Sequence, residues 1–304
     1  MKILLLGKNG QVGWELQRSL APLGDLVALG SNSSADSTGL CGDLSNLAGI
    51  AATVRAVAPD IIVNAAAHTA VDRAESEPEL ARLINAQAPG VLALEAARSG
   101  ALLVHYSTDY VFDGSGDQPW IETDATGPLG VYGQSKLEGE QAILASGCRH
   151  LIFRTSWVYA ARGANFAKTM LRLAQEREHL NVIDDQIGAP TGADLLADVT
   201  AHALRAAAHR PQVLGLYHLA ASGHTSWHGY ASFVIQTARE AGLDIKVAPD
   251  SIEHVASSAF VTAAVRPQNS RLNTHKLQTA FDLHLPDWQT GVARMLTEIT
   301  EKKT

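Results

Sequence analysis

MKILLLGKNGQVG, residues Met1 to Gly13, is the stretch of sequence that decides the fold. The apolar run 3–6 ends at a turn with three glycines, and apolar residues at helical spacing follow it directly. Glycines at such a turn let the backbone bend sharply, approach a pyrophosphate and pack a helix closely on a strand. The helix N-terminus beyond the turn offers unpaired N–H groups to an anion. The spacing is GxxGxxG, and its position between strand and helix favours a dinucleotide site over an ordinary turn.

Short apolar runs alternate with longer amphipathic stretches in the first half of the chain. The runs predict strands over 3–6, 26–29, 61–63, 102–104 and 151–153, and the spacing predicts helices over 11–20, 47–57 and 80–98. Strands that are apolar throughout and separated by helices are typical of a parallel sheet covered on both faces. The sequence therefore predicts an α/β fold with a Rossmann-type doubly wound parallel sheet.

The alternation loosens after about residue 160. We expect strands at 182–183 and 216–219, helices over 195–208 and 230–241, and one helix within 285–300. No linker rich in Pro, Gly or Ser separates the two halves. We therefore predict an NAD(P)-binding domain over 1–160 and a smaller C-terminal substrate-binding lobe over 161–304, with some segments of the lobe returning to the sheet.

Composition excludes several classes of protein. The 304 residues are 46% hydrophobic and 18% charged, which is typical of a globular fold. Two separate cysteines, Cys41 and Cys148, exclude a disulfide scaffold and a cysteine-based zinc site. The net charge of -7 and the lack of a basic cluster exclude a nucleic-acid partner. No apolar run approaches the ~18 residues of a membrane helix, and the N-terminal run is too short for a signal peptide, so we expect a cytoplasmic protein.

A second motif, YGQSK at 132–136, places Tyr132 and Lys136 on one face of a helix. A neighbouring ammonium stabilises a phenolate, so we expect Lys136 to lower the pKa of Tyr132 and make it a proton donor near neutrality. Such a pair also occurs by chance on helix surfaces. It gains weight here because VHYSTDYVF, at 104–112, puts hydroxyls and a carboxylate just past a buried strand, where ligands of parallel sheets bind. The Thr108 hydroxyl there can donate to a carbonyl oxygen.

The second predicted strand ends at Gly30 without the carboxylate that usually follows a dinucleotide-binding turn by about 20 positions. Ser31, Asn32 and Ser33, with Lys8 nearby, can hydrogen-bond a 2′-phosphate. An ordinary polar loop explains them equally well. The choice between NADPH and NADH therefore stays open from the sequence.

These motifs together resemble the extended short-chain dehydrogenase/reductases. The resemblance rests on GKNGQVG at 7–13, GD at 42–43, NAAA at 64–67, TAVD at 69–72, STDYVFDG at 107–114, YGQSK at 132–136, SWVY at 156–159, GAPT at 188–191 and RPQNS at 266–270. It extends from residue 1 to about 298 and is strongest to members that reduce a nucleotide-linked keto sugar. It implies reduction of the C4 ketone of dTDP-4-dehydro-L-rhamnose to dTDP-L-rhamnose by NADPH or NADH.

The resemblance also implies roles for single residues. Tyr132 and Lys136 would be the catalytic pair, and Thr108 would hydrogen-bond the reacting oxygen. Thr108 and Asp109 would contact the sugar, and Trp157 would pack against it, although Trp157 also suits a place in the core. The residues implied to bind the cofactor are Gly7, Gly10, Gln11, Val12, Gly13, Asp43, Leu44, Ala65, Ala66, Ala67, His68, Thr69, Tyr106, Tyr132 and Lys136.

Two groups of side chains have the chemistry of metal ligands. Glu15, Asp194 and Glu298 match acidic positions that bring Mg²⁺ to a dimer interface in some family members, so the resemblance implies a homodimer and a Mg²⁺ site. Asp194 is shorter than the glutamate usual there. His224 and His228 have a spacing that suits zinc on a helix, but no third ligand accompanies them, and we expect capping or surface packing instead.

Two other functions stay open. A nucleotide-sugar epimerase or dehydratase would share the fold and the Tyr132/Lys136 pair, although a dehydratase would need a second carboxylate beside Asp109. A non-catalytic dinucleotide-binding subunit, similar to the regulatory subunit of methionine adenosyltransferase, would need neither Tyr132 nor Lys136. Their presence favours an enzyme.

Overall fold

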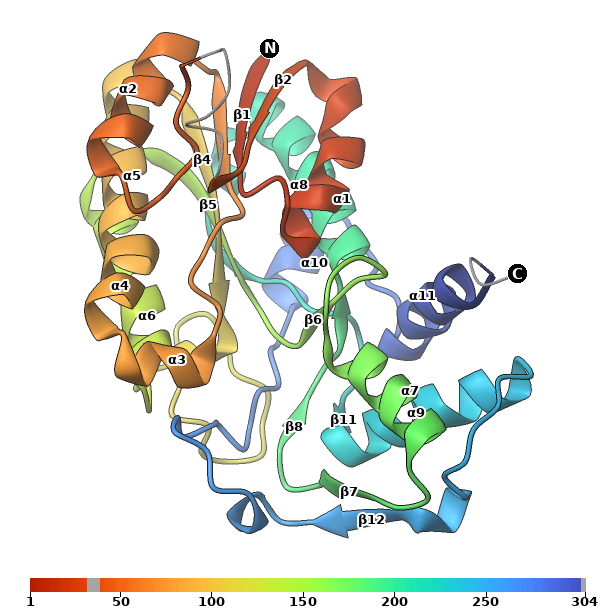
Figure 1. Ribbon diagram of the computed structural model, residues 1–304. Coiled ribbons are helices and arrows are strands. Elements are labelled where there is room, and N and C mark those ends of the chain that lie inside the picture. Colours follow the sequence, from red (N-terminus) through yellow and green to blue (C-terminus); the bar gives the residue numbers. More distant parts are fainter. Residues whose placement is uncertain (32–38, 302–304) are drawn as a thin grey trace.

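The computed structural model describes residues 1–31 and 39–301. Its centre is a six-stranded parallel sheet with the order β10-β5-β4-β3-β1-β2 (Figure 1). The strands are β1 (Lys2–Leu6), β2 (Asp25–Leu29), β3 (Ile61–Asn64), β4 (Leu102–Thr108), β5 (Arg149–Thr155) and β10 (Gly215–His218). The strand order reverses between β1 and β3, which confirms the predicted doubly wound sheet.

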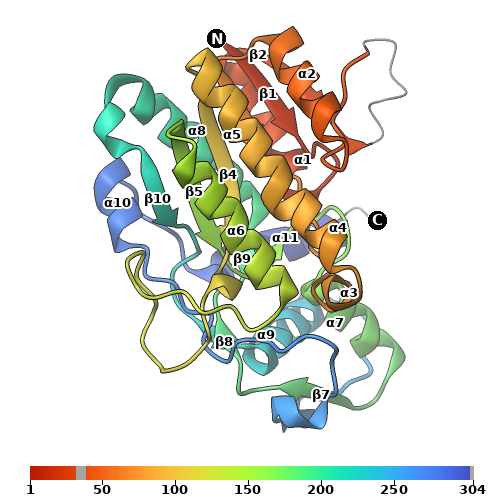
Figure 2. The same cartoon turned by 90° about the vertical axis from the view of Figure 1, so that its left-hand side faces the viewer.

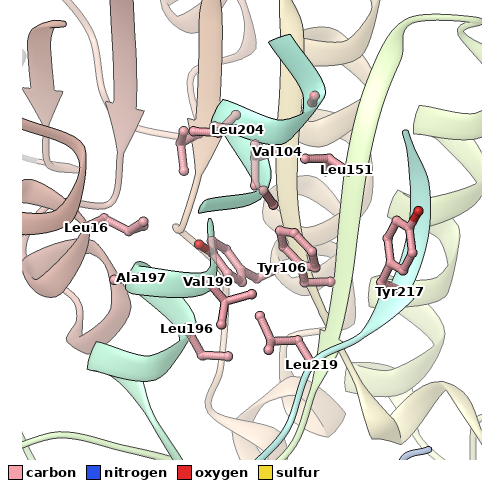
Figure 3. Packing of buried hydrophobic residues seen from close by; sticks show 14 of the residues in the cluster. Leu16, Val104, Tyr106, Leu151, Leu196, Ala197, Val199, Leu204, Tyr217 and Leu219 are labelled. Atoms are coloured by element: carbon pink, nitrogen blue, oxygen red, sulfur yellow. The ribbon is translucent and has the colours of Figure 1, made fainter. Parts of the chain in front are cut away.

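Helices cover both faces of this sheet (Figures 1 and 2). α1 (Gln11–Leu20) and α8 (Ala193–His209) lie on one face, and α2 (Leu47–Val57), α5 (Ala88–Ser99) and α6 (Val131–Ala145) lie on the other. Alternate side chains of β1 feed two separate hydrophobic layers because neighbouring residues of a strand point to opposite faces. Figure 3 shows the first layer, which includes Leu16 of α1, Leu196 of α8 and Val104 of β4.

The predicted helix over 80–98 is interrupted. α4 (Pro78–Arg82) passes through a π-helical segment, Leu83–Gln87, into α5, which ends at Gly100 in the left-handed conformation. Pro89 has no N–H to donate to the carbonyl of Asn85, so the regular hydrogen-bond ladder cannot continue there. The widened turn lets the Asn85 side chain bond Ser135 of α6 at 3.0 Å.

The C-terminal lobe is built from α7 (Phe166–Glu176), α9 (Trp227–Glu240) and α11 (Trp288–Glu301) around an aromatic core. Its strands form the pairs β7 (Leu180–Ile183) with β12 (Ile252–Val255), β8 (Ile187–Gly188) with β11 (Thr225–Ser226), and β6 (Val158–Tyr159) with β9 (Thr191–Gly192). Patterning missed α7, the shorter strands, the helix α3 (Val71–Ser76) and the helix α10 (His275–Phe281).

Segments from the second half do return to the sheet. β10 adds its edge strand beside β5, and α8 packs against α1. The division of the chain at residue 160 stays a prediction. Over the described ranges, none of the helices has both the length and the hydropathy needed to cross a membrane.

Candidate active site

Two glycines of the turn after β1 have no room for a side chain. Gly7 has φ 90°, and a Cβ there would lie 2.7 Å from the backbone nitrogen of Ala66. A Cβ on Gly13 would lie 2.0 Å from the carbonyl oxygen of Gly7, so this glycine lets α1 pack closely against the turn that follows the strand. Gly10 precedes α1 and supplies no side-chain cap. The bare helix N-terminus beside a narrow backbone cradle fits the pyrophosphate of a dinucleotide.

A cavity of about 700 Å³ opens at this turn and extends along the carboxyl ends of the strands. It brings together most of the predicted residues, which are Gly7, Gly10, Gln11, Val12, Asp43, Leu44, Ala65, Ala66, Ala67, Thr69, Tyr106, Thr108, Asp109, Tyr132, Lys136 and Trp157. The sequence analysis missed Asn9, Gly30, Gly42, Val71, Ile84, Ser107, Tyr110, Thr155, Ser156, Val158 and Trp227. Most of these residues lie next to a predicted residue in the sequence, and this proximity was the signal that could have identified them. Ile84 and Trp227 had no such signal.

Two predicted cofactor residues do not line the cavity. Gly13 lies behind Gly7, and His68 is tied through its backbone N–H and carbonyl to the Asn85 amide at 2.8 and 3.0 Å. The His68 ring faces Glu77, with 3.6 Å between Nε2 and Oε2. Both residues support the wall of the cavity.

Tyr106 reaches the cavity but its hydroxyl is used elsewhere. The phenol oxygen lies 2.6 Å from Thr200 Oγ1 in α8, inside the hydrophobic layer of Figure 3. Burial raises the pKa of Tyr106 above its ordinary value, and the bond to Thr200 opposes this only in part. Tyr106 therefore contributes its backbone to this region of the site, because its carbonyl accepts from Lys136 at 2.6 Å.

The motif at 132–136 lies in the first turns of α6, as predicted. A hydrogen bond joins the hydroxyls of Tyr132 and Thr108, and the ring of Tyr110 meets the Tyr132 ring edge-on at 5.5 Å. Burial raises the pKa of Tyr132 to about 12, the Thr108 bond opposes the rise, and the charge of Asp109 adds to it. The predicted lowering of this pKa by Lys136 is therefore wrong for this structure, because desolvation of the phenolate dominates.

The amine of Lys136 points to other partners. Its Nζ donates to Tyr106 O and lies 3.2 Å from Nε2 of His105. Burial lowers the pKa of Lys136 to about 8, against the opposing charge of Glu140. Near neutral pH the pair therefore consists of a protonated phenol and a lysine that is still mostly charged, although the pKa of Lys136 lies well below its ordinary value.

The end of β4 supplies a buried carboxyl beside the phenol. Thr108 donates to Asp109 Oδ1 at 3.1 Å and accepts from the backbone N–H of Tyr110 at 3.2 Å. Burial raises the pKa of Asp109 to about 6, with hydrogen bonds from Ser270 and Thr108 opposing the shift. Asp109 is the carboxylate that this strand end offers, as the sequence predicted.

Trp157 is half-buried and forms an aromatic platform with Trp227, the first residue of α9. The two rings stack with centroids 3.6 Å apart and planes inclined by 11°. Trp157 has φ 48°, and a Cβ on Gly188 would lie 2.6 Å from its ring. Trp157 lines the cavity and also packs against the core of the lobe, so its contact with the substrate stays a prediction.

A larger hollow of about 1270 Å³ adjoins this platform in the lobe. Trp227 lines both cavities. Arg266, another lining residue, is held by Asp72 at 2.6 Å, which fixes a loop of the lobe against α3.

The structure describes only some of the residues that could hydrogen-bond a 2′-phosphate. Ser31 lines the first cavity and Lys8 does not. Asn32 and Ser33 lie outside the described residues.

The predicted metal ligands do not form a cluster within the described chain. Asp194 is paired with Arg294 at 2.8 Å, and Glu15 lies 3.5 Å from Arg18. The third residue, Glu298, lies on α11. A site shared between two copies of the chain stays a prediction.

His228 is used for packing, as expected. Its ring stacks on His254 at 3.5 Å, and its Nε2 bonds the carbonyl of Ile252 at 3.0 Å. With Asp184, these two histidines form the group in the described residues whose ligand atoms lie close enough for a metal, and His224 is not part of it. Two of the ring nitrogens in this group have protein partners, because His228 Nε2 bonds Ile252 O and His254 Nδ1 bonds Asp184 Oδ2, at 3.0 and 2.9 Å.

Known proteins share this architecture over the whole chain. The family model described as RmlD substrate binding domain matches residues 1–301. The dTDP-4-dehydrorhamnose reductase of Escherichia coli K12 is 62% identical over 299 residues, covering 98% of each chain. The crystal structure of a dTDP-4-dehydrorhamnose reductase from Clostridium acetobutylicum is 32% identical with a TM-score of 0.88, covering 99% of this chain and 100% of that one. The Bacillus anthracis enzyme in complex with NADP is 34% identical with a TM-score of 0.86, covering 98% and 99%. This chain belongs to the RmlD substrate-binding-domain family of extended short-chain dehydrogenase/reductases.

Proposed function

We propose that this protein reduces the C4 ketone of dTDP-4-dehydro-L-rhamnose to dTDP-L-rhamnose with NADPH or NADH. The observation that carries the proposal is the convergence of Tyr132, Thr108 and Lys136 in the cavity that begins at the glycine turn. The 62% identical Escherichia coli relative carries the name of this reductase, and the Bacillus anthracis relative binds NADP.

The cofactor would lie along the glycine turn. Gly7 and Gly10 would leave the backbone open to its pyrophosphate, Asp43 and Leu44 would lie by its adenine, and Lys136 would hold its nicotinamide ribose. The reduced nicotinamide supplies a hydride to C4 of the sugar when it is bound. The small residues Ala65, Ala66 and Ala67 line the path between these ends, so the wall can approach a flat ring closely.

Tyr132 is the proton donor in this assignment. Because its pKa is raised to about 12, the phenol carries its proton at neutral pH. It can release that proton to an oxygen at C4 as negative charge develops there, a contribution of ~10²–10⁴-fold for general acid catalysis. Thr108, already bonded to the phenol, is placed to share a hydrogen bond with the same oxygen.

The sugar and its nucleotide would occupy the aromatic platform and the hollow beyond it. The methyl group and C–H bonds of a deoxysugar suit the apolar face of Trp157. Asp109 would accept from a sugar hydroxyl, and the adjoining hollow in the lobe would receive the dTDP group. We further propose a cytoplasmic homodimer, with Glu15, Asp194 and Glu298 as ligands for a bridging Mg²⁺.

The proposal is tested by incubating the protein with dTDP-4-dehydro-L-rhamnose and NADPH while following the absorbance of the reduced nicotinamide. We expect steady oxidation of NADPH and formation of dTDP-L-rhamnose. An epimerase or dehydratase would change the sugar without net oxidation, and a non-catalytic binding subunit would leave both compounds unchanged.

A further inference from the structure

The loop between β6 and α7, residues 160–165, lies against the N-terminus of α1 (Figure 1). Asn165, the residue before α7, donates from Nδ2 to Oε1 of Gln11, the first residue of α1, at 3.1 Å. The guanidinium carbon of Arg162 lies 4.0 Å from the centre of the Trp14 ring, one turn further along α1. Two separate contacts therefore join this loop to the helix that follows the glycine turn.

The partners of Asn165 fix the orientation of two side-chain amides. Its Oδ1 accepts from the backbone N–H of Lys168 at 3.1 Å and so caps α7. Its Nδ2 donates to the carbonyl of Ala160 at 2.7 Å and to Gln11. A backbone N–H can only donate and a backbone carbonyl can only accept, so the Asn165 amide has one possible orientation. Gln11 must therefore turn its oxygen to Asn165 and its NH₂ group away from it.

Gln11 stands where the diphosphate of a dinucleotide would lie. It follows Gly10 directly and lines the cavity, and its Nε2 makes no hydrogen bond to any residue that the structure describes. Of the lysines and arginines in the described chain, Lys136 is the one that lines this cavity, and it belongs to the motif on α6. Asn9 also lines the cavity, but a Cβ on Gly30 would lie 2.6 Å from its Nδ2, so this amide is turned to the end of β2. The charge of a diphosphate at the turn would therefore be met by backbone N–H groups and by the amide of Gln11.

We propose that Asn165 is a positioning residue that holds the NH₂ group of Gln11 toward the diphosphate of the bound dinucleotide. Without Asn165, the Gln11 amide can turn about its terminal bond and present its oxygen, which repels a phosphate. Fixing the amide before binding removes this wrong orientation and the entropy cost of ordering a free side chain. The inference rests on the proposed function for its ligand, and it adds to the site a residue that does not line the cavity.

The loop is braced so that Asn165 keeps its place beside Gln11. Lys168 Nζ donates to the carbonyls of Ala161 and Gly163 at 2.8 and 2.7 Å. Gly163 also comes close to the stem of Gln11, because a Cβ there would lie 3.5 Å from Gln11 Cγ. The cations of this loop offer a competing explanation, since a positive charge near a diphosphate raises affinity whichever way an amide points. The experiment must therefore separate the orientation of Gln11 from the charge of the loop.

Binding of NADPH and of ADP-ribose, measured by isothermal titration calorimetry without sugar, is the test. Asn165→Ser keeps a cap for α7, because serine also accepts from the start of a helix, but its side chain is too short to reach Gln11. We expect the Kd of both ligands to rise about 5-fold, the effect of freeing one side chain at the site. ADP-ribose has the diphosphate and lacks the nicotinamide, so an equal loss for the two ligands places the effect away from the nicotinamide.

A double-variant cycle shows whether Asn165 acts through Gln11. Gln11→Met removes the amide and should raise the Kd about 10-fold, the size of one hydrogen bond to a charged group. Adding Asn165→Ser to Gln11→Met should then change the Kd no further, because the group that Asn165 orients is gone. Thr169→Ala is the matched control, since Thr169 is exposed and bonds only the backbone carbonyl of Asn165, at 2.9 Å. This variant disturbs the start of α7 and should leave the Kd unchanged.

The outcomes separate the explanations. If Asn165 only caps α7 or holds the cations of the loop near the site, Asn165→Ser has the same effect on the Kd with and without the Gln11 amide, and the proposal fails. If Asn165→Ser does not fold, Asn165→Asp takes its place in the cycle. It keeps the cap, and its added charge acts equally in both backgrounds, so equal losses there also overturn the proposal. A protein that shows the expected coupling but oxidises no NADPH with the keto sugar contradicts the proposed function alone.

Discussion

Trp157 and Trp227 lie face to face, with ring centroids 3.6 Å apart, although one follows a strand of the central sheet and the other begins a helix of the lobe. The stack joins the cofactor cavity to the hollow in the lobe, because Trp227 lines both. A substrate that spans the two parts of the protein would pass this pair.

Trp157→Ala should lower kcat/KM for the sugar while the melting temperature stays close to that of the wild type. The half-buried ring loses a stacking interaction worth about 0.5–1.5 kcal/mol, whereas its apolar face is lost to the substrate entirely. Trp288, which is 5% exposed in the core of the lobe, is the comparison: Trp288→Ala should cost about 3–5 kcal/mol. A thermal melt and a titration with the sugar substrate, both on the Trp157→Ala variant, test this prediction. A melting temperature well below that of the wild type together with unchanged kinetics would show that Trp157 is not part of the site.

Tyr132→Phe should abolish most turnover and leave cofactor binding nearly intact, because only the transferable proton is removed. We expect kcat to fall by about 10²–10⁴-fold. Steady-state kinetics together with a fluorescence titration of NADPH provide the measurement. Turnover near that of the wild type would contradict the acid role.

Asp109→Asn should stabilise the protein at pH 7 and impair sugar binding. The carboxyl titrates near 3.8 when unfolded and at about 6 when folded, so the folded state binds more protons between these values. Stability therefore falls as the pH rises through this window, and above pH 6 the wild type bears the full cost, on the order of 3 kcal/mol. Urea unfolding at pH 3.5 and pH 7 should show the variant's advantage only at pH 7; an equal advantage at both would argue against the buried charge.

NADPH should be used at least as well as NADH. The end of β2, at Gly30 and Ser31, carries no carboxylate that would repel a 2′-phosphate. Values of kcat/KM for the two cofactors, measured side by side, test this expectation. A strong preference for NADH would contradict it.

Gly13→Ala should destabilise the protein and weaken cofactor binding. The added Cβ would stand 2.0 Å from Gly7 O, so α1 or the turn must move, at a cost of about 1–3 kcal/mol. Gly10→Ala is the matched control for stability, since its Cβ would meet Gly7 O at an ordinary 3.5 Å. Equal melting temperatures for the two variants would show that the close approach is relieved without strain.

Short-range sequence patterns were sufficient to predict the strands of the sheet and two motifs that line the cavity. Apolar runs predicted the six strands of the sheet because the central strands of a parallel sheet are covered on both faces, and buried strand positions are mostly apolar. The glycine turn and the pair Tyr132 and Lys136 were readable because their geometry depends on spacings of a few residues. The comparisons confirm the family that these motifs indicated.

Packing between segments that are distant in the sequence decided the remaining contacts of the site and the pKa values of its groups. Trp227 stacks on Trp157, and His105 and Asn64 lie behind Lys136. These contacts form only because separate elements converge on one edge of the sheet. No short-range spacing in the sequence predicts that convergence. The spacing of Tyr132 and Lys136 predicted a lowered phenol pKa, yet Tyr132 titrates at about 12. Desolvation depends on everything that surrounds a group, and the amine of Lys136 is turned to Tyr106 and His105. The sequence therefore predicts Tyr132 as the acid, while the proton affinity of its phenol depends on burial in the folded protein.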